Sequence, residues 1–174
     1  MDERKDLVTF KGEPLTLIGK QLEAGQPLPE SELLDNGLAP VKLSSLKGRC
    51  LVVSVVPSLD TPVCDAQTRR FNEEASNMGE DVTVLTVSMD LPFAQARWCG
   101  AAGIDGVMTL SDHREGDFGL KSGLLIKELR LLARAVFVVD TEGIIRYKQL
   151  VKEVASEPDY EAAIEALKSV KNSL

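Results

Sequence analysis

A run of apolar β-branched residues leads directly into a cysteine that opens a helical pattern, and this junction constrains the fold more than any other stretch. Residues 51–56, LVVSVV, are apolar except for one serine, as expected for a strand buried on both faces, and Pro57 ends that strand. From Cys64 onward, one stripe recurs at the three- and four-residue spacing of a helix. Its members are Cys64, Thr68, Phe71, Ala75 and Met78.

The thiol of Cys64 falls in the first turn of this predicted helix. The positive end of the helix dipole and the unpaired backbone N–H groups both favour the thiolate, which is the reactive form of cysteine. The alternative is a packed core cysteine, since free cysteine is among the most buried residue types. The spacing of Pro57, Thr61 and Cys64 favours the reactive thiol.

Length and composition suit one compact domain over residues 1–174, because 44% of the residues are hydrophobic. The net charge of −7 argues against a nucleic-acid-binding surface. Residues 1–24 contain no apolar run of signal-peptide length, and no later run approaches membrane-spanning length. We therefore expect a cytoplasmic location.

The three cysteines are too few and too far apart for the disulfide framework of a secreted protein. No C-x-x-C pair is present to bind zinc or to form a thioredoxin-type motif, so catalytic or redox use fits better. His113 is the single histidine, which leaves little room for a Cys–His dyad or a His-rich metal site. Because it lies in the polar run 111–116, we expect it in a solvated loop.

Strand and helix patterns alternate along the chain and predict an α/β protein. We expect an N-terminal β-hairpin within residues 1–20, and then the order βαβα followed by ββα. This order predicts a thioredoxin-like layout, with a mixed central sheet and helices on both faces. Asp90 is expected to cap the second helix, and Ser156 with Asp159 to cap the last one. The expected strands are 8–10, 14–18, 38–43, 50–56, 82–88, 107–110, 135–139 and 144–151, and the expected helices are 64–78, 92–102 and one after 156.

Pro57, Thr61 and Cys64, in PSLDTPVC, resemble the Pro-x-x-x-Thr-x-x-Cys pattern of the peroxiredoxins. Four longer segments resemble the thiol peroxidase branch of that family, the atypical two-cysteine class. They are SLDTPVCDAQTRRFNEE, SMDLPFAQARWCG, LLARAVFVVD and SEPDYEAAIEALK. These matches extend from about residue 43 to residue 167, and the N-terminal hairpin also fits this branch. The resemblance implies the thioredoxin-like peroxiredoxin fold and a thiol-dependent peroxidase.

The resemblance also implies roles for five residues. Cys64 would be the peroxidatic cysteine, which attacks one peroxide oxygen, releases water or an alcohol and becomes a sulfenic acid. Cys99 would be the resolving cysteine, which condenses with that sulfenic acid into a disulfide within one chain. Thr61 would place a hydroxyl near the sulfur and the bound peroxide, while Pro57 would shield the thiolate. Arg134 would contact both the thiolate and the peroxide.

Charged residues near Cys64 affect how stable its thiolate can be. Asp60 and Asp65 flank the site and would oppose a thiolate by like-charge repulsion. Arg134, just before the apolar run 135–139, is the best candidate to offset them, since a charge there needs a partner. The alternative for Arg134 is a solvated residue at a strand end. Arg69 and Arg70 lie off the Cys64 face of the helix, and we expect both at the surface.

Without the resemblance, the residues alone favour a buried structural thiol for Cys99. Because Cys64 and Cys99 both lie on expected helices, bringing their Cα atoms to the ~5.5 Å of a disulfide requires partial unwinding unless they already abut. Gly100 and Gly103 lower the helical propensity near Cys99 and favour such unwinding. Cys50 matches no peroxiredoxin role, and we expect it to be structural.

The resemblance implies hydroperoxide substrates, thioredoxin as the outside reductant, a homodimer, and no metal, flavin or haem cofactor. Two other functions stay open on the residues alone. A redox sensor would use oxidation of Cys64 to change an interaction with a partner. A thiol–disulfide exchanger would reduce disulfides without peroxide, although the absence of C-x-x-C counts against it.

Overall fold

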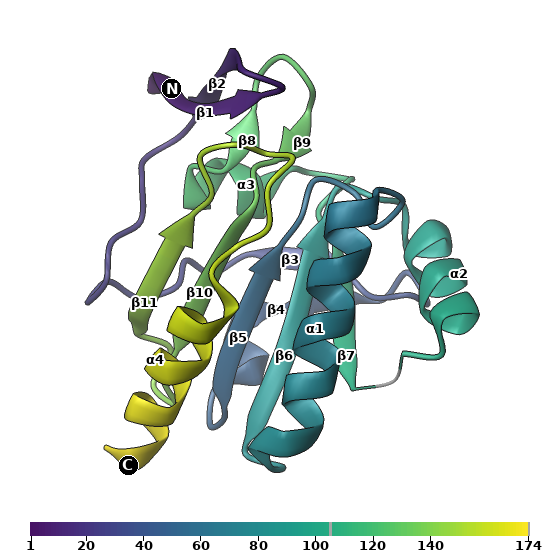
Figure 1. Ribbon diagram of the computed structural model, residues 1–174, viewed down its shortest axis with the longest axis vertical. Helices are drawn as coiled ribbons and strands as arrows, with labels where there is room; N and C mark the ends of the chain where they lie inside the picture. The colour runs from purple at the N-terminus through teal and green to yellow at the C-terminus, as the bar shows by residue number, and fades with distance from the viewer. Residues whose placement is uncertain (105, 174) are drawn as a thin grey trace.

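The computed structural model describes residues 1–104 and 106–173, without the side chain of Ala75. Figure 1 shows a central sheet with helices on its faces and a smaller sheet at one end. The strands are β1 (Glu3–Phe10), β2 (Glu13–Ile18), β3 (Glu32–Leu34), β4 (Pro40–Lys42), β5 (Cys50–Val55), β6 (Val82–Ser88), β7 (Val107–Ser111), β8 (Leu125–Ile126), β9 (Leu131–Leu132), β10 (Ala135–Val139) and β11 (Ile145–Leu150). The helices are α1 (Pro62–Met78), α2 (Pro92–Ala102), α3 (Asp117–Ser122), α4 (Tyr160–Asn172) and the 3-10 turn η1 (Leu43–Leu46).

The central sheet is mixed, as the sequence predicts. Its strand order over the described residues is β11-β10-β5-β6-β7-β3-β4. Strands β5, β6 and β7 run parallel, while β10 is antiparallel to both β5 and β11. Strand β5 lies between β10 and β6, and all of its residues are buried. The expected apolar strand therefore forms the middle of the molecule and directs the chain toward α1.

Alternate residues of the central strands feed two separate cores. Val52 and Val136 face the cluster under α1 and α4, together with Phe71. Val53 and Phe137 face the opposite cluster, which the N-terminal hairpin and α3 cover. In Figure 1, α1 and α4 lie on the near face of the sheet. Because side chains of a strand alternate between faces, the period-two pattern of β5 and β10 fills both layers.

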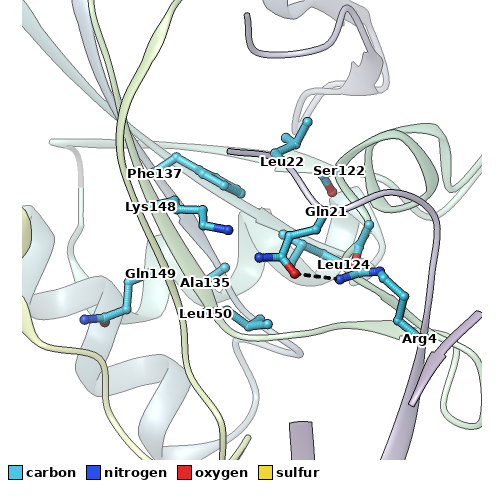
Figure 2. Close-up of a pocket in the computed structure, with 11 residues that line it drawn as sticks. Arg4, Gln21, Leu22, Ser122, Leu124, Ala135, Phe137, Lys148, Gln149 and Leu150 are labelled. Carbon is cyan, nitrogen blue, oxygen red and sulfur yellow. Dashed lines mark hydrogen bonds between the residues drawn. The ribbon is translucent and has the colours of Figure 1, made fainter. Parts of the chain in front are cut away.

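The N-terminal hairpin is confirmed and joins a second sheet of order β1-β2-β8-β9. Arg4 anchors it, because its guanidinium donates to the Gln21 side chain at 3.2 Å and to the Gly123 carbonyl. Figure 2 shows these side chains around a pocket of about 20 Å³, which has room for little more than one water molecule. Ala135 and Phe137 line this pocket on the sheet face opposite α1, so it is not part of a site at Cys64.

Two expected helix caps are wrong. Leu91, not Asp90, is the N-cap of α2, and Asp159 alone caps α4 by accepting a hydrogen bond from the Ala162 N–H. Asp90 is occupied elsewhere, because its carboxylate accepts hydrogen bonds from the Ser58 hydroxyl and the Leu59 N–H. A sequence pattern identifies a capping residue type but not the competing partners that the fold brings to it.

The expected strand 38–43 is also wrong in its bounds, since β4 begins at Pro40 and pairs with β3. Leu38 lies in the intervening turn with a φ of 68°. Asp35 closes this turn by accepting hydrogen bonds from the N–H groups of Gly37 and Ala39. An Asx-type turn of this kind replaces strand pairing with local side-chain bonds.

None of the helices in the described part of the chain combines the length and the apolar character needed to cross a bilayer.

Asp112 joins β7 to α3 and is buried at 2% exposure. Burial raises the pKa of its carboxyl to about 6, although the N–H groups of Phe118 and Gly119 donate to it. The folded protein therefore holds this proton at pH values where the unfolded chain, with an aspartate pKa of about 4, has released it. The contribution of Asp112 to the free energy of unfolding thus falls as pH rises from about 4 to about 6.

We predict that carboxyl-carbon NMR of the folded protein will give Asp112 a titration midpoint near pH 6. Relative to Asp112→Asn, the wild type should lose up to about 3 kcal/mol of stability in urea unfolding between pH 4 and pH 7. A midpoint at or below pH 4 would contradict this prediction.

Candidate active site

Cys64 is the third residue of α1, because the helix begins at Pro62. Its side chain is 0% exposed and packs with Val56, Leu59 and Trp98. The backbone N–H groups of a first helical turn have no partners within the helix, and the dipole is positive there. The predicted position of the thiol at the helix start is therefore confirmed.

The predicted stripe of α1 faces the interior. Cys64, Thr68, Phe71 and Met78 are buried, while the side chain of Ala75 lies outside the described part of the chain. Thr68 donates its hydroxyl to the Cys64 carbonyl at 2.8 Å, one turn along the helix. The stripe thus fixes the rotation of α1 and directs Cys64 toward the sheet.

Arg134 contacts the thiol directly. Its Nη2 lies 3.2 Å from the Cys64 Sγ, while its Nε donates to the Val154 carbonyl at 2.9 Å. Register explains this contact, because Ala135 pairs with Val55 across β10 and β5. Arg134 therefore lies beside the end of β5, where the chain turns toward α1.

The guanidinium of Arg134 is buried at 2% exposure, so the alternative of a solvated strand-end residue is wrong. Among the described residues, no carboxylate forms a salt bridge with it. A buried cation without an anion is costly, and the sulfur of Cys64 is the contacting atom that can become one. The contact places a buried guanidinium N–H donor on the sulfur of Cys64.

Gln67 orients the guanidinium, and the sequence interpretation missed it. Its Oε1 accepts from Arg134 Nη1 at 2.9 Å, and its Nε2 donates to the Ser54 hydroxyl at 2.7 Å. Both Gln67 and Ser54 are fully buried. Two signals were available in the sequence: Ser54 interrupts an apolar strand, and Gln67 lies three positions after Cys64 on the same helix face.

Thr61 and Pro57 bound the loop between β5 and α1. Pro57 is buried directly after the strand, and Thr61 is the N-cap of α1. The Thr61 hydroxyl is exposed and donates to the Ser58 carbonyl at 2.9 Å. This bond turns the hydroxyl toward the loop backbone, so a contact between Thr61 and the sulfur stays a prediction.

Asp65 is held by groups other than Arg134. Its carboxylate accepts from Arg69 Nε at 2.8 Å and from the indole Nε1 of Trp98 at 2.9 Å. Arg69 is exposed, as expected, but this ion pair means that Arg69 offsets the charge of Asp65. Arg134 contacts the sulfur itself, as expected for the charge that offsets these carboxylates, and Arg69 adds an i, i+4 partner for Asp65 that the sequence interpretation missed.

Asp90 ties the active-site loop to the start of α2. Its carboxylate accepts from the Ser58 hydroxyl at 2.7 Å, the Leu59 N–H at 2.8 Å and the Ser88 hydroxyl at 2.8 Å. An open groove of about 370 Å³ runs between this loop and α2. Leu59 and Trp98 line the groove and also pack against Cys64, which lies behind them.

Cys99 lies on α2, as predicted, and its thiol contacts β7. The Sγ is 3.7 Å from the Thr109 hydroxyl on β7, and that hydroxyl donates to Asn36. Burial raises the pKa of the Cys99 thiol, while the contact with Thr109 lowers it. Cys64 and Cys99 are both free thiols, and Cys64 packs with Trp98 whereas Cys99 contacts Thr109.

Cys50 lies at the opposite end of β5 from the active-site loop and is fully buried. Burial raises the pKa of its thiol, and the nearby carboxylate of Asp81 adds to that effect. A buried neutral thiol is inert, which supports the expected structural role. His113 lies in a turn after β7, as predicted for a loop residue.

Comparisons with known proteins agree on one family. The Redoxin family matches residues 23–164. A thiol peroxidase of Bacillus subtilis is 55% identical over 163 residues, covering 94% of this chain and 97% of that protein. One of Oceanobacillus iheyensis is 57% identical over 160 residues, covering 92% and 97%.

A solved structure gives the same result for the fold. The crystal structure of a peroxiredoxin-like protein from Aquifex aeolicus superimposes with a TM-score of 0.89 at 40% identity, over 98% of this chain and 99% of that one. The thioredoxin-like peroxiredoxin fold is therefore confirmed. With a buried cysteine–arginine pair at a helix start and relatives of this similarity, the chain belongs to the Redoxin family, within its thiol peroxidase branch.

Proposed function

We propose that this thiol peroxidase reduces hydrogen peroxide and organic hydroperoxides through Cys64 and Cys99. The Cys64 thiolate attacks one peroxide oxygen, the O–O bond breaks, and water or an alcohol leaves after taking a proton. The Cys64 sulfenic acid then condenses with the Cys99 thiol, which forms the disulfide and releases water. An outside dithiol returns both cysteines to their thiol form.

The observation that carries this proposal is the 3.2 Å contact between Arg134 Nη2 and the buried Cys64 Sγ. During attack, negative charge moves from the sulfur to the leaving oxygen. A guanidinium fixed by Gln67 and the Val154 carbonyl can stabilise that charge without rearranging. Because the pair is buried, the electrostatic interaction is stronger than it would be in water.

Two residues of the loop complete the proposed site. Pro57 would shield the thiolate from solvent on the side of β5, where it is buried. Thr61 would rotate its hydroxyl from the Ser58 carbonyl toward a bound peroxide, since a threonine χ1 rotation exchanges one acceptor for another. The open groove beside α2 supports an approach of small peroxides from that side.

The proposed partners follow from the chemistry and the relatives. Thioredoxin is the proposed reductant, because its low reduction potential suits a protein disulfide. We further propose a homodimer, a cytoplasmic location, and a single domain over residues 1–174.

Cysteine variants test the cycle. In an assay coupled to thioredoxin and its reductase, we expect Cys64→Ser to show no peroxidase activity with hydrogen peroxide or an alkyl hydroperoxide, because the nucleophile is lost. Cys99→Ser should undergo one oxidation per chain and then fail to turn over with thioredoxin. Cys50→Ala is the matched control and should retain wild-type turnover.

Intact-mass measurement of the oxidised wild type should show the loss of two hydrogens, and peptide mapping should locate the bridge between Cys64 and Cys99. Sustained turnover of Cys99→Ser would contradict the resolving role. Stoichiometric oxidation of the wild type without turnover would favour a redox sensor instead.

Arg134 variants test the electrostatic part. We expect Arg134→Met to slow the reaction of Cys64 with peroxide by about 10² to 10³, the usual effect of removing one charge-stabilising donor. Arg134→Lys keeps the positive charge but loses the simultaneous contacts with Val154, Gln67 and Cys64. Its rate of reaction with peroxide should therefore lie between the rates of Arg134→Met and the wild type. Stopped-flow oxidation with matched unfolding curves would measure this. A rate for folded Arg134→Met within twofold of wild type would refute the role.

A further inference from the structure

We propose that Asp65, Trp98 and Arg69 form a latch that holds α2 closed over Cys64, and that this latch sets the rate of disulfide formation. The proposal rests on the proposed function, because it assigns a device to the step that joins Cys64 and Cys99. The three residues act as positioning residues.

The latch consists of three contacts, of which two join α1 to α2 and one lies within α1. Asp65 accepts the indole N–H of Trp98 at 2.9 Å and the guanidinium N–H of Arg69 at 2.8 Å. The Arg69 guanidinium also lies 5.7 Å from the centroid of the Trp98 ring, within the range of a cation–π contact. One carboxylate and one guanidinium on α1 thus hold both the polar tip and the ring of one side chain on α2.

Apart from this latch, α2 is weakly anchored. Its buried residues are Pro92 and Gln95, both in the first half of the helix. Gln95 donates to the Ser88 hydroxyl and the Leu110 carbonyl, which fixes that half to β6 and β7. The second half has no fully buried residue. It is held by the half-buried Trp98, by packing of Ala102, by the contact of Cys99 with Thr109 and by a 3.5 Å hydrogen bond from Arg69 to the Ala102 carbonyl, and it ends at Gly103, which adopts the left-handed conformation. This half can therefore open while the first half stays bound.

Trp98 also occupies the space next to the reacting sulfur. It packs against the cluster of Val56, Leu59 and Cys64, whereas the neighbouring Cys99 faces Thr109. Consecutive residues on a helix point about 100° apart, so a helical α2 that keeps Trp98 on this cluster keeps Cys99 away from it. Cys99 can reach Cys64 only after Trp98 leaves.

The latch therefore opposes formation of the disulfide between Cys64 and Cys99. Sulfur–sulfur bond formation between the Cys64 sulfenic acid and the Cys99 thiol releases one water molecule, and it needs the open form of α2. Any interaction made only in the closed form lowers the population of the open form. While the latch stays closed, the sulfenic acid persists and a second peroxide can oxidise it to the sulfinic acid.

Variants of Asp65 test this on the full chain. Asp65→Ala removes the hydrogen bond between the carboxylate and the Trp98 indole, and a bond to a charged group is worth enough free energy to change a rate about tenfold. After a single peroxide addition, this variant should therefore form the disulfide about ten times faster than the wild type. Asp65→Asn keeps an acceptor for the indole and should lie between Ala and wild type. Quenched-flow alkylation with mass spectrometry counts thiol, sulfenic acid, sulfinic acid and disulfide. The sulfinic fraction should fall as closure accelerates.

Asp60→Ala is the matched control, because it removes the same charge from an exposed position beside Cys64 that does not contact Trp98. Its closure rate should stay within about twofold of wild type, because it leaves the latch contact in place. Amide exchange of the reduced proteins adds a readout without peroxide. Residues 97–102 should exchange about tenfold faster in Asp65→Ala than in Asp60→Ala.

The outcomes separate the latch from the function. A wild type that forms no Cys64–Cys99 bridge would overturn the proposed function. A wild type that forms the bridge, with equal closure rates and equal exchange in Asp65→Ala and Asp60→Ala, would overturn the latch alone. If both variants formed the disulfide equally faster than the wild type, the latch would also be overturned, because the loss of a negative charge near Cys64 would then explain the rate.

Discussion

The buried contact between Arg134 and Cys64 is the interaction on which the active site depends. A guanidinium at 2% exposure carries a desolvation cost of several kcal/mol, and the described residues offer it no carboxylate. Three contacts of the guanidinium offset this cost. They are made to the Gln67 amide, the Val154 carbonyl and the Cys64 sulfur. The fold thus brings one fixed, buried cation into contact with the sulfur of Cys64.

The topology of the central sheet makes this contact possible. Strand β5 delivers the chain to the loop before α1, and the antiparallel neighbour β10 brings Arg134 to the same end of the sheet. Neither strand can shift by one residue, since each feeds alternating side chains to two different cores. The packing of residues far from the sulfur therefore fixes the distance between the guanidinium and the thiol.

The sequence was most informative where one local rule decides the outcome. The helix start at Cys64 and the apolar strand before Pro57 follow from periodicity, and both are confirmed. The sequence interpretation missed the hydrogen-bond partners of Asp65, Asp90 and Gln67. Each of these partners lies on another element of the fold, which only the tertiary structure brings near. A capping pattern assumes that the carboxylate accepts hydrogen bonds from the helix that follows it. The Asp90 carboxylate instead accepts hydrogen bonds from Ser58 and Leu59 in the loop before α1.

The two helices that carry the reacting cysteines are held to different degrees, and this difference suits their tasks. Helix α1 buries its stripe against the sheet, and this packing holds Cys64 at the guanidinium. Helix α2 is fixed at Pro92 and Gln95, whereas its second half combines partial packing of Trp98 with hydrogen bonds to α1 at the groove. An apolar anchor there would hold Cys99 against Thr109 too firmly, whereas a hydrogen bond exposed at the groove can exchange with water. Polar anchoring of α2 therefore suits the proposed cycle, in which a buried nucleophile on α1 and a thiol on α2 react with each other.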